Sequence, residues 1–251
     1  MDKAIIRVSC ISLLITKGSR LNYSPTVYLG GGEMHISKNK TATYELSDVS
    51  IKDIAKQSFL VLDLEATGLS TTDDCITQFA CVPLVDGKIQ SGKAFSSFIK
   101  SPKAIPKKIE KLTGIGNKDV SKAPQFKEVI TKMLHEYNDY IWTAQCGFEF
   151  DFPIIESLCK NDGIGFTPKT MDTKVLFAFL NPKSDETFST DFLKDHFQID
   201  SSGLKRHTAL GDALLTAKIL QKIIGVYKEK GVKDLKIDDA LSIRKFIPKA
   251  L

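Results

Sequence analysis

Much of the chain consists of short apolar runs followed by longer amphipathic segments. At 58–65 (SFLVLDLE) four consecutive apolar residues run directly into two acids, a pattern typical of a buried strand that ends in polar side chains. Residues 75–99 predict two further strands joined by Asp86 and Gly87, a dipeptide common in tight hairpin turns. Residues 139–145 predict another strand.

The segments between and after these strands have a helical pattern. Helices are predicted at 106–115, 123–137, from residue 152, and at 171–180, 189–197 and 209–230. In the last of these, apolar residues recur at intervals of three and four positions, at Leu210, Leu214, Ala217, Leu220, Ile224 and Tyr227. Strands first, followed by a strand that alternates with helices, predict an α/β fold with a mixed central β-sheet flanked by helices.

Residues 1–57 have a different texture, with short β-type runs separated by Gly, Ser, Pro and Asn. This pattern predicts a small β-rich N-terminal extension, whose role the sequence does not assign. The run 4–16 could be the apolar part of a signal peptide. It is interpreted as a strand instead, because Arg7 interrupts it and no small-residue cleavage site follows. The glycines at 30–32 predict a tight turn, and a phosphate-binding loop is the alternative, although no GK[ST] follows. Residues 43–56 predict a short helix that begins near Ser47 or Asp48.

These patterns divide the chain into an extension (1–57), a catalytic-type domain (58–230) and a basic C-terminal tail (231–251). The chain has 251 residues, of which 42% are hydrophobic and 26% charged, as in ordinary globular proteins. A net charge of +5 is compatible with a polyanionic partner but does not require one. Five cysteines without a CxxC pair argue against a disulfide framework or zinc site, so we expect a reducing, cytoplasmic location. No apolar run reaches the ~20 residues of a membrane span, and no membrane partner is expected.

Two acids stand at the end of the first predicted strand of the domain. Asp63 and Glu65 are two positions apart, so their side chains point to one face, at the strand end where ligands tend to bind in open α/β sheets. Buried charge is costly unless it is paired or bound to a metal. One interpretation is that both acids pair with lysines or cap the next loop, and the other is that they bind a cation.

Further acids follow later elements. Asp151 comes after the strand at 139–145, where it either caps the next helix or joins the first two acids. Asp212 lies among the apolar residues of the long helix, where a carboxylate is out of place unless it meets a cation. His207, five residues earlier, is a candidate general base beside this acidic cluster, with a plain surface histidine as the alternative.

Four carboxylates that converge from separate elements would repel one another strongly. Mg²⁺ and Mn²⁺ prefer oxygen ligands, and two such ions ~3.5–4 Å apart can share a bridging carboxylate. Such a pair suits phosphodiester hydrolysis, because it lowers the pKa of an attacking water and stabilises the charge on phosphorus and on the leaving oxygen. An imidazole, which titrates near pH ~6.5 in peptides, can accept the proton of that water.

Three blocks together resemble the DEDDh 3′–5′ exonucleases, the DnaQ-like family: DLEATGL at 63–69, FEFD at 148–151 and HTALGD at 207–212. The interval from His207 to Asp212 is that of the histidine subtype. The segments VDGKI, IEKLTGIGNKDVSKAP and MDTKVLF are similar to the proofreading epsilon subunit of bacterial DNA polymerase III and its Gram-positive polymerase relatives.

The resemblance covers about residues 58–228 and implies a ribonuclease H-like fold. It also implies two Mg²⁺ or Mn²⁺ ions held by Asp63, Glu65, Asp151 and Asp212, with His207 as general base. Substrate contacts are implied at Ala66, Thr67, Gly68, Leu69 and Phe150. Two departures bear on the grip on the substrate: Ala66 replaces a frequent Thr, and Cys146-Gly147 replaces a common His-Asn.

The function implied is hydrolysis at the 3′ end of single-stranded DNA with release of nucleoside 5′-monophosphates, by a DNA polymerase subunit or a free-standing enzyme. An RNA 3′-end trimming exoribonuclease is the alternative, and a non-catalytic nucleic-acid-binding module is a further one. A lysine-rich stretch either tracks a nucleic-acid backbone or forms a solvated surface; it holds Lys100, Lys103, Lys107, Lys108, Lys111, Lys118 and Lys122. The segment 243–251 is either a docking peptide or a frayed terminus.

Overall fold

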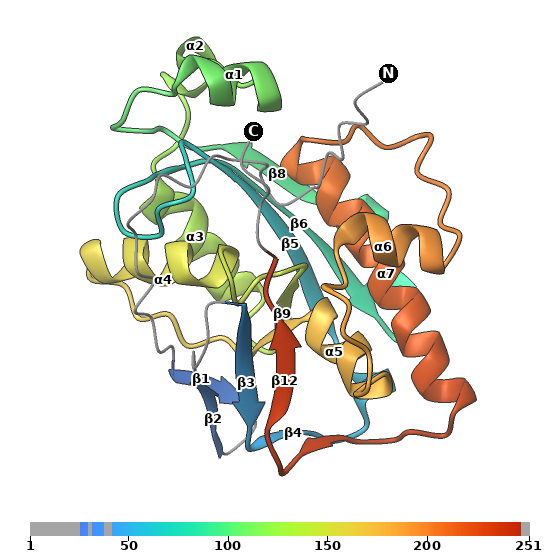
Figure 1. Cartoon of the computed structure of the whole chain (residues 1–251). Coiled ribbons are helices and arrows are strands. Elements are labelled where there is room, and N and C mark those ends of the chain that lie inside the picture. Colours follow the sequence, from blue (N-terminus) through green and yellow to red (C-terminus); the bar gives the residue numbers. More distant parts are fainter. Residues whose placement is uncertain (1–25, 30–31, 38–41, 247–251) are drawn as a thin grey trace.

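The computed structural model describes residues 26–29, 32–37 and 42–246. A mixed sheet forms its centre, in the order β10-β9-β5-β6-β7, with β8 also paired to β6 (Figure 1). β5 runs parallel to β9 and antiparallel to β6, as predicted for a mixed sheet. The strands are β5 (Phe59–Ala66), β6 (Ile76–Val85), β7 (Lys88–Ile89), β8 (Phe95–Phe98), β9 (Ile141–Ala144) and β10 (Thr170–Asp172).

Helices cover both faces of this sheet. In Figure 1, α3 and α4 lie on one side of β5 and β6, whereas α5 and α7 lie on the other. The pair α1 and α2 projects from one end and has a small core of its own, made of Ile105, Ile109, Ile115 and Val120. The helices are α1 (Lys107–Thr113), α2 (Asn117–Val120), α3 (Phe126–Glu136), α4 (Asp151–Asn161), α5 (Thr173–Leu180), α6 (Thr190–His196) and α7 (Ala209–Glu229). Within the described ranges, no helix has the length and apolar character that crossing a bilayer requires.

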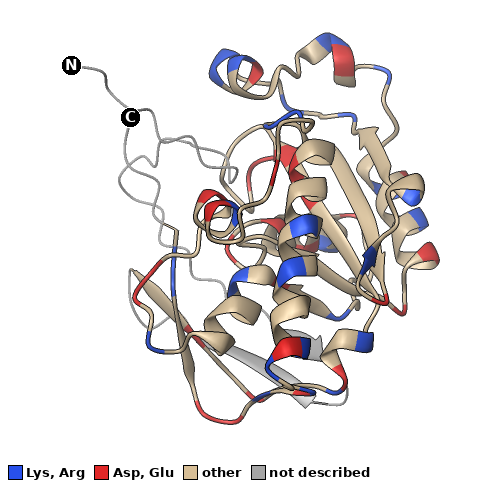
Figure 2. Ribbon diagram, turned by 90° about the vertical axis from the view of Figure 1, so that its right-hand side faces the viewer, with Lys and Arg blue, Asp and Glu red and all other residues tan. Residues whose placement is uncertain are grey.

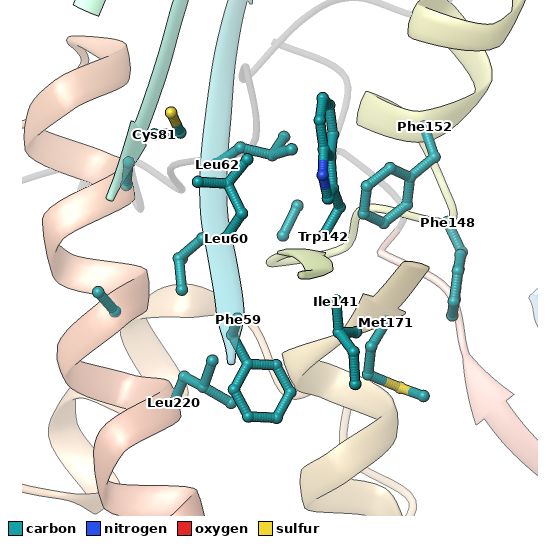
Figure 3. Close-up of a cluster of buried hydrophobic side chains, with 14 of the residues drawn as sticks. Phe59, Leu60, Leu62, Cys81, Ile141, Trp142, Phe148, Phe152, Met171 and Leu220 are labelled. Carbon is teal, nitrogen blue, oxygen red and sulfur yellow. The ribbon is translucent and has the colours of Figure 1, made fainter. Parts of the chain in front are cut away.

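The core explains why β5 is an almost continuous apolar run. Side chains from both faces of β5 are fully buried, because helices cover the sheet on each side. Figure 3 shows this core: Phe59, Leu60 and Leu62 from β5, Leu220 from α7, and Trp142 and Phe152 from β9 and α4. The Trp142 ring is fully buried, and its Nε1–H donates to the Tyr137 carbonyl (3.1 Å). The first catalytic-type acids thus extend from a rigidly packed strand.

A second, smaller sheet joins the two ends of the chain. Its order is β1-β2-β3-β12, and we call these four strands the accessory sheet. The strands are β1 (Thr26–Leu29), β2 (Gly32–Ser37), β3 (Thr43–Ser47) and β12 (Leu241–Arg244). A separate antiparallel pair links β4 (Val49–Ile51) with β11 (Leu235–Ile237). Segments almost 200 residues apart, such as Tyr44 and Ile243, therefore face each other in register.

The structure corrects one prediction in the N-terminal extension. The helix predicted at 43–56 is wrong: this segment forms β3, β4 and a short 3₁₀ turn (Ile54–Lys56). The buried residues Tyr44 and Leu46 alternate with partly exposed ones, which is the two-residue period of a strand. Asp48, between the two strands, has a left-handed φ of 60°, so it ends β3 rather than starting a helix.

The C-terminal segment also differs from a simple tail. Residues 235–237 and 241–244 are strands that pair with β4 and β3. The boundaries after residues 57 and 230 stay a prediction. Strands that precede residue 57 pair with strands that follow residue 230. The predicted strand at 4–16 and the turn at Gly30 and Gly31 lie outside the described residues, as does the end of the chain after residue 246.

Candidate active site

Three of the predicted acids meet at one point of the fold. Asp63 and Glu65 project from the C-terminal half of β5, and Asp212 lies in the first turn of α7, which packs against β5 and β6. One carboxylate oxygen from each of Asp63, Glu65 and Asp212 lies within 4.8 Å of the others. Glu65 and Asp212 are buried, with 4% and 2% of their surface exposed. A set of carboxylate oxygens at this spacing has the donor chemistry that hard divalent cations prefer.

The start of α7 holds Asp212 in place. The Thr208 side chain caps the helix by accepting a hydrogen bond from the Gly211 N–H (3.2 Å). A Cβ added at Gly211 would come within 1.9 Å of the Lys205 carbonyl oxygen, so only glycine allows this close approach of loop and helix. The HTALGD motif therefore contains a structural glycine beside its acid.

Asp212 accepts two hydrogen bonds from the residues just before the helix. Arg206 Nε donates to Oδ1 (2.7 Å), and the His207 backbone N–H donates to Oδ2 (2.9 Å). Arg206 also bridges to Asp191 on α6 (3.2 Å). The guanidinium thus places one positive charge against the three acids.

His207 has a left-handed backbone conformation, with φ of 60°. Its side chain is partly exposed, while its N–H is tied to Asp212. The backbone at His207 is therefore held beside Asp212, and the side chain is partly open to solvent.

Asp151 reaches the same region from the opposite side of β5. It is the first residue of α4 and is 6% exposed. Asp151 does not belong to the group of three acids within 4.8 Å, but its charge raises the pKa of both Asp63 and Glu65. The structure therefore brings all four acids into one electrostatic cluster, with Asp151 at its edge.

The turn before α4 explains the Cys146-Gly147 departure from the family pattern. Cys146 has a left-handed φ of 59°. A Cβ added at Gly147 would come within 2.6 Å of the Phe152 ring and 2.8 Å of the Ala144 Cβ. The turn is therefore packed too tightly for any larger residue at position 147.

Burial raises the pKa of every acid in the cluster, and repulsion by neighbouring acids of the cluster adds to this at Asp63 and Glu65. Burial, and then the charges of Asp212 and Asp151, raise the pKa of Glu65 to about 8. Burial, with a contribution from Asp172, raises the pKa of Asp151 to about 8. Burial, and next the charge of Asp212, raise the pKa of Asp63 well above its usual range. The pKa of Asp212 is raised by burial despite Arg206 beside it. The chain alone does not balance this charge.

The predicted substrate-contact residues fall into two groups. Ala66, Thr67 and Gly68 are buried, whereas Leu69 and Phe150 are partly exposed. The Thr67 hydroxyl donates to Asp74 Oδ1 (2.8 Å), which also accepts from Lys103 Nζ (2.5 Å). Side-chain contact with a ligand is thus open to the second group, while the first shapes the turn after β5.

A second buried charged group was not found from the sequence. Glu149, in the turn that carries Asp151, pairs with the fully buried Lys174, and the buried Asp172 accepts hydrogen bonds from the same turn. The Lys174 Nζ contacts Glu149 Oε1 at 2.5 Å. The lysine stands in the apolar context TKVLFAF, which is the signal that could have identified it as a buried residue.

Comparisons with known proteins place this fold and site in a class. The family model described as an exonuclease (RNase_T) matches residues 60–220. Of solved structures, the nuclease domain of 3′hExo, a DEDDh family member, superposes with a TM-score of 0.60 over 73% of this chain and 97% of that one, at 15% identity. The cell-death related nuclease CRN-4 gives a TM-score of 0.58 at 19% identity, over 68% of this chain and 64% of that one. The fold is thus that of ribonuclease H-like exonucleases.

Curated relatives narrow the class further. A DNA polymerase III of PolC type from Caldanaerobacter subterraneus subsp. tengcongensis is 31% identical over 177 residues, which is 70% of this chain and 12% of the relative. A DNA polymerase III subunit epsilon-like protein from Rhodobacter capsulatus is 29% identical over 178 residues, which is 70% of this chain and 25% of the relative. The chain therefore spans a quarter or less of the length of these two relatives. It belongs to the exonuclease family.

Proposed function

We propose that this chain is a metal-dependent 3′–5′ exonuclease that removes nucleoside 5′-monophosphates from the 3′ end of single-stranded DNA. The observation that carries the proposal is the convergence of Asp63, Glu65 and Asp212 within 4.8 Å, with Asp151 close enough to act on their charge. Acids with pKa values raised by one another are the expected state of a metal site before the ion balances its ligands. The family membership supplies the direction of the reaction.

Asp63, Glu65, Asp151 and Asp212 would hold two divalent ions, Mg²⁺ or Mn²⁺. Bound divalent ions supply a more acidic attacking water and stabilise the negative charge of the phosphate. The chain contributes a dry, rigid frame: β5 fixes two acids, while α7 and α4 fix one each. Because their pKa values are raised, these acids would be largely protonated near neutral pH, and bound divalent ions would favour their ionised form.

His207 would accept the proton of the attacking water. Its side chain is partly exposed, and its backbone N–H is bound to Asp212. Arg206, which contacts Asp212 and Asp191, would hold the loop that carries His207 while the acids bind ions. Proton transfer by a positioned side chain typically contributes ~10²–10⁴-fold to the rate.

A single strand would enter across the surface near α1 and α2. Lys108, Lys111, Lys118 and Lys122 are exposed there, whereas Lys103 and Lys107 pair with Asp74 and Glu110. Figure 2 shows positive segments on these two helices at the top of the molecule, with acidic ones between them. The mixed charge supports weak, salt-dependent contact with a phosphate backbone.

The names of the relatives suggest two biological settings. The polymerase III relatives favour DNA and a proofreading role beside a polymerase. The solved structure of 3′hExo is bound to rAMP, and Exonuclease X is solved in complex with 5′ overhanging duplex DNA. RNA 3′-end trimming is therefore the second candidate, with the same chemistry at the site.

A matched set of oligonucleotides tests the proposal. DNA and RNA of one sequence, labelled at the 5′ end, are incubated with Mn²⁺ as single strands and as duplexes with paired or mispaired 3′ ends. We expect the single strand of DNA to be shortened stepwise from its 3′ end, and a mispaired end faster than a paired one. Faster degradation of RNA would favour the second candidate, and no shortening of any substrate would refute the exonuclease assignment.

A further inference from the structure

The accessory sheet meets the turn before α4 at a buried charged group. Lys174, at the start of α5, is fully buried and pairs with Glu149 of that turn. The second carboxylate oxygen of Glu149 accepts a hydrogen bond from the backbone N–H of Phe246, two residues after β12 (2.8 Å). Glu149 is thus held by α5 on one side and by the C-terminal strand segment on the other.

Asp172 holds the same turn from the end of β10. Its carboxylate accepts hydrogen bonds from the backbone N–H groups of Cys146 (3.1 Å) and Phe148 (3.3 Å). It also accepts from the Lys174 N–H (2.9 Å), which caps α5. Because these donors lie three to five residues before Asp151, one fully buried carboxylate fixes the path of the chain into α4.

β3 of the accessory sheet brings a buried tyrosine near this group. Tyr44 is 2% exposed, and its hydroxyl has no hydrogen-bond partner within the described part of the chain. The charges of Asp172 and Glu149 add to burial in raising the pKa of Tyr44, so the ring lies close to both. Tyr44 is paired in register with Ile243 of β12, the strand that leads to Phe246.

We propose that the accessory sheet is a positioning element for Asp151, which acts through Phe246, Glu149 and the buried Lys174–Asp172 group. The sheet lies outside the region matched by the exonuclease family, residues 60–220. Strands from both ends of this chain thereby set the position of one acid in the cluster, and with it the affinity for divalent ions. The effect on the affinity for divalent ions rests on the proposed function, whereas the effect of the sheet on the position of the turn does not.

A charged cluster that only stabilises the fold would look similar in a static structure. The difference lies in what a small change does. Loss of a purely stabilising contact lowers the melting temperature without loosening one turn or changing metal affinity. Loss of a positioning contact in the outer shell of a metal site typically lowers metal affinity ~10–100-fold.

Phe246 offers a variant that removes the hydrogen-bond donor to Glu149. Phe246→Pro deletes the N–H that Glu149 accepts, and Phe246→Leu keeps the N–H while removing the ring. Phe246 is partly exposed at the end of the described chain, so neither change disturbs the core. Tyr227→Phe serves as a stability control, because that buried hydroxyl donates to the Leu176 carbonyl of α5 and not to the turn before α4.

Two readouts are taken on each full-length variant. Hydrogen exchange of the amides at 145–151 is measured without metal, and Mn²⁺ affinity is measured by calorimetry. For Phe246→Pro we expect faster exchange in this segment and Mn²⁺ affinity ~10-fold weaker. Phe246→Leu and Tyr227→Phe should match the wild-type protein in both readouts, even where the melting temperature falls.

A second pair of variants checks the inner contact. Glu149→Gln removes the charge that pairs directly with the buried Lys174, and the double variant with Lys174→Met removes both charges of this pair. We expect both to weaken Mn²⁺ binding, because each releases the turn. Equal exchange and equal Mn²⁺ affinity in Phe246→Pro and Phe246→Leu would overturn the inference. If the wild-type protein binds no Mn²⁺, the proposed function fails, while the exchange comparison still decides whether the sheet holds the turn.

Discussion

The acidic residues of the site together carry more negative charge than the neighbouring basic residues balance. Burial, and then the charges of Asp212, Asp151 and Glu65, raise the pKa of Asp63, while Arg206 lowers it. Arg206 is bound to Asp212 through Nε and to Asp191 through its terminal nitrogen. Ionisation of these buried carboxylates is therefore favourable only if a further cation binds beside them.

Asp212→Asn is expected to abolish Mn²⁺-dependent shortening of a 5′-labelled single strand. The change keeps the shape of the side chain and removes the negative charge that Asp63 and Glu65 repel. We expect a loss on the order of a thousandfold or more, because a bound metal ion contributes several kcal/mol of transition-state stabilisation. The melting temperature of the metal-free variant serves as the control for folding. Retained activity would refute the ligand role of Asp212.

His207→Asn is expected to lower turnover by ~10²–10⁴-fold and to leave Mn²⁺ binding intact. Asparagine tolerates the left-handed backbone of this position and keeps the N–H that Asp212 accepts, but it cannot accept a proton near neutral pH. The measurement is the pH–rate profile at saturating Mn²⁺. A variant that keeps the wild-type profile would show that His207 is not the base.

At the level of elements, the short turn between β9 and α4 positions an acid by tight packing. Gly147 lies against the Phe152 ring and the Ala144 Cβ, with no room for a methyl group. The Phe152 N–H donates to the Gly147 carbonyl (2.9 Å), so this contact also starts α4. A change at position 147 therefore acts on Asp151 through the helix start.

Gly147→Ala is expected to destabilise the fold by about 1–3 kcal/mol, the usual effect of overpacking a buried site. It should also weaken Mn²⁺ binding, since Phe152 and the start of α4 must move to admit the methyl group. Gly165→Ala is the matched control, because a Cβ there meets nothing within 4 Å. Thermal unfolding and calorimetry measure the two effects. Wild-type stability in Gly147→Ala would contradict the packing argument.

Local sequence patterns predicted the elements that carry the acids. The apolar run before Asp63 reports burial on both faces, and the spacing of apolar residues up to Tyr227 reports a long helix, α7 (Ala209–Glu229). The segment 43–56 misled because polar and charged residues surround its buried ones, and its helix-cap residues Ser47 and Asp48 turned out to end a strand. Periodicity of two in so short a run is easily missed.

At the scale of the whole molecule, contacts between distant segments could not be read from the sequence. β3 pairs with β12 across almost the full length of the described chain, and nothing local in either strand names its partner. The Glu149–Lys174 pair likewise joins distant residues: the apolar neighbours of Lys174 indicate that it is buried, but nothing local indicates that Glu149 is its partner. The acids, by contrast, were predictable as a set because each follows a recognisable element and their motif spacing resembles a known family.

The charge of the site predicts how stability changes with pH. In the metal-free protein, Glu65 and Asp151 have pKa values raised to about 8, so the folded state keeps protons that the unfolded chain has released. Between the ordinary carboxyl pKa of ~4 and the raised value, the free energy of unfolding must therefore fall as pH rises. Asp172 and Glu156, whose pKa values are raised to about 7, add to this trend.

We expect the metal-free protein to melt at a lower temperature at pH ~8 than at pH ~5.5, and Mn²⁺ to raise the melting temperature more at the higher pH. Glu156 lies outside the four-acid cluster, so Mn²⁺ bound at the site does not change its contribution. The part of the pH dependence of the melting temperature that Mn²⁺ removes therefore comes from the four acids. Asp212→Asn should show a smaller response to Mn²⁺. A melting temperature that rises from pH ~5.5 to ~8 without metal would contradict the sign of this argument.

The most direct test is an anomalous-scattering map from crystals soaked with Mn²⁺ and a nucleoside 5′-monophosphate. The account predicts two Mn²⁺ peaks ~3.5–4 Å apart, bounded by Asp63, Glu65, Asp151 and Asp212. The phosphate should lie between the peaks and the His207 side chain. An empty site at saturating Mn²⁺, or peaks bound by other residues, would contradict it.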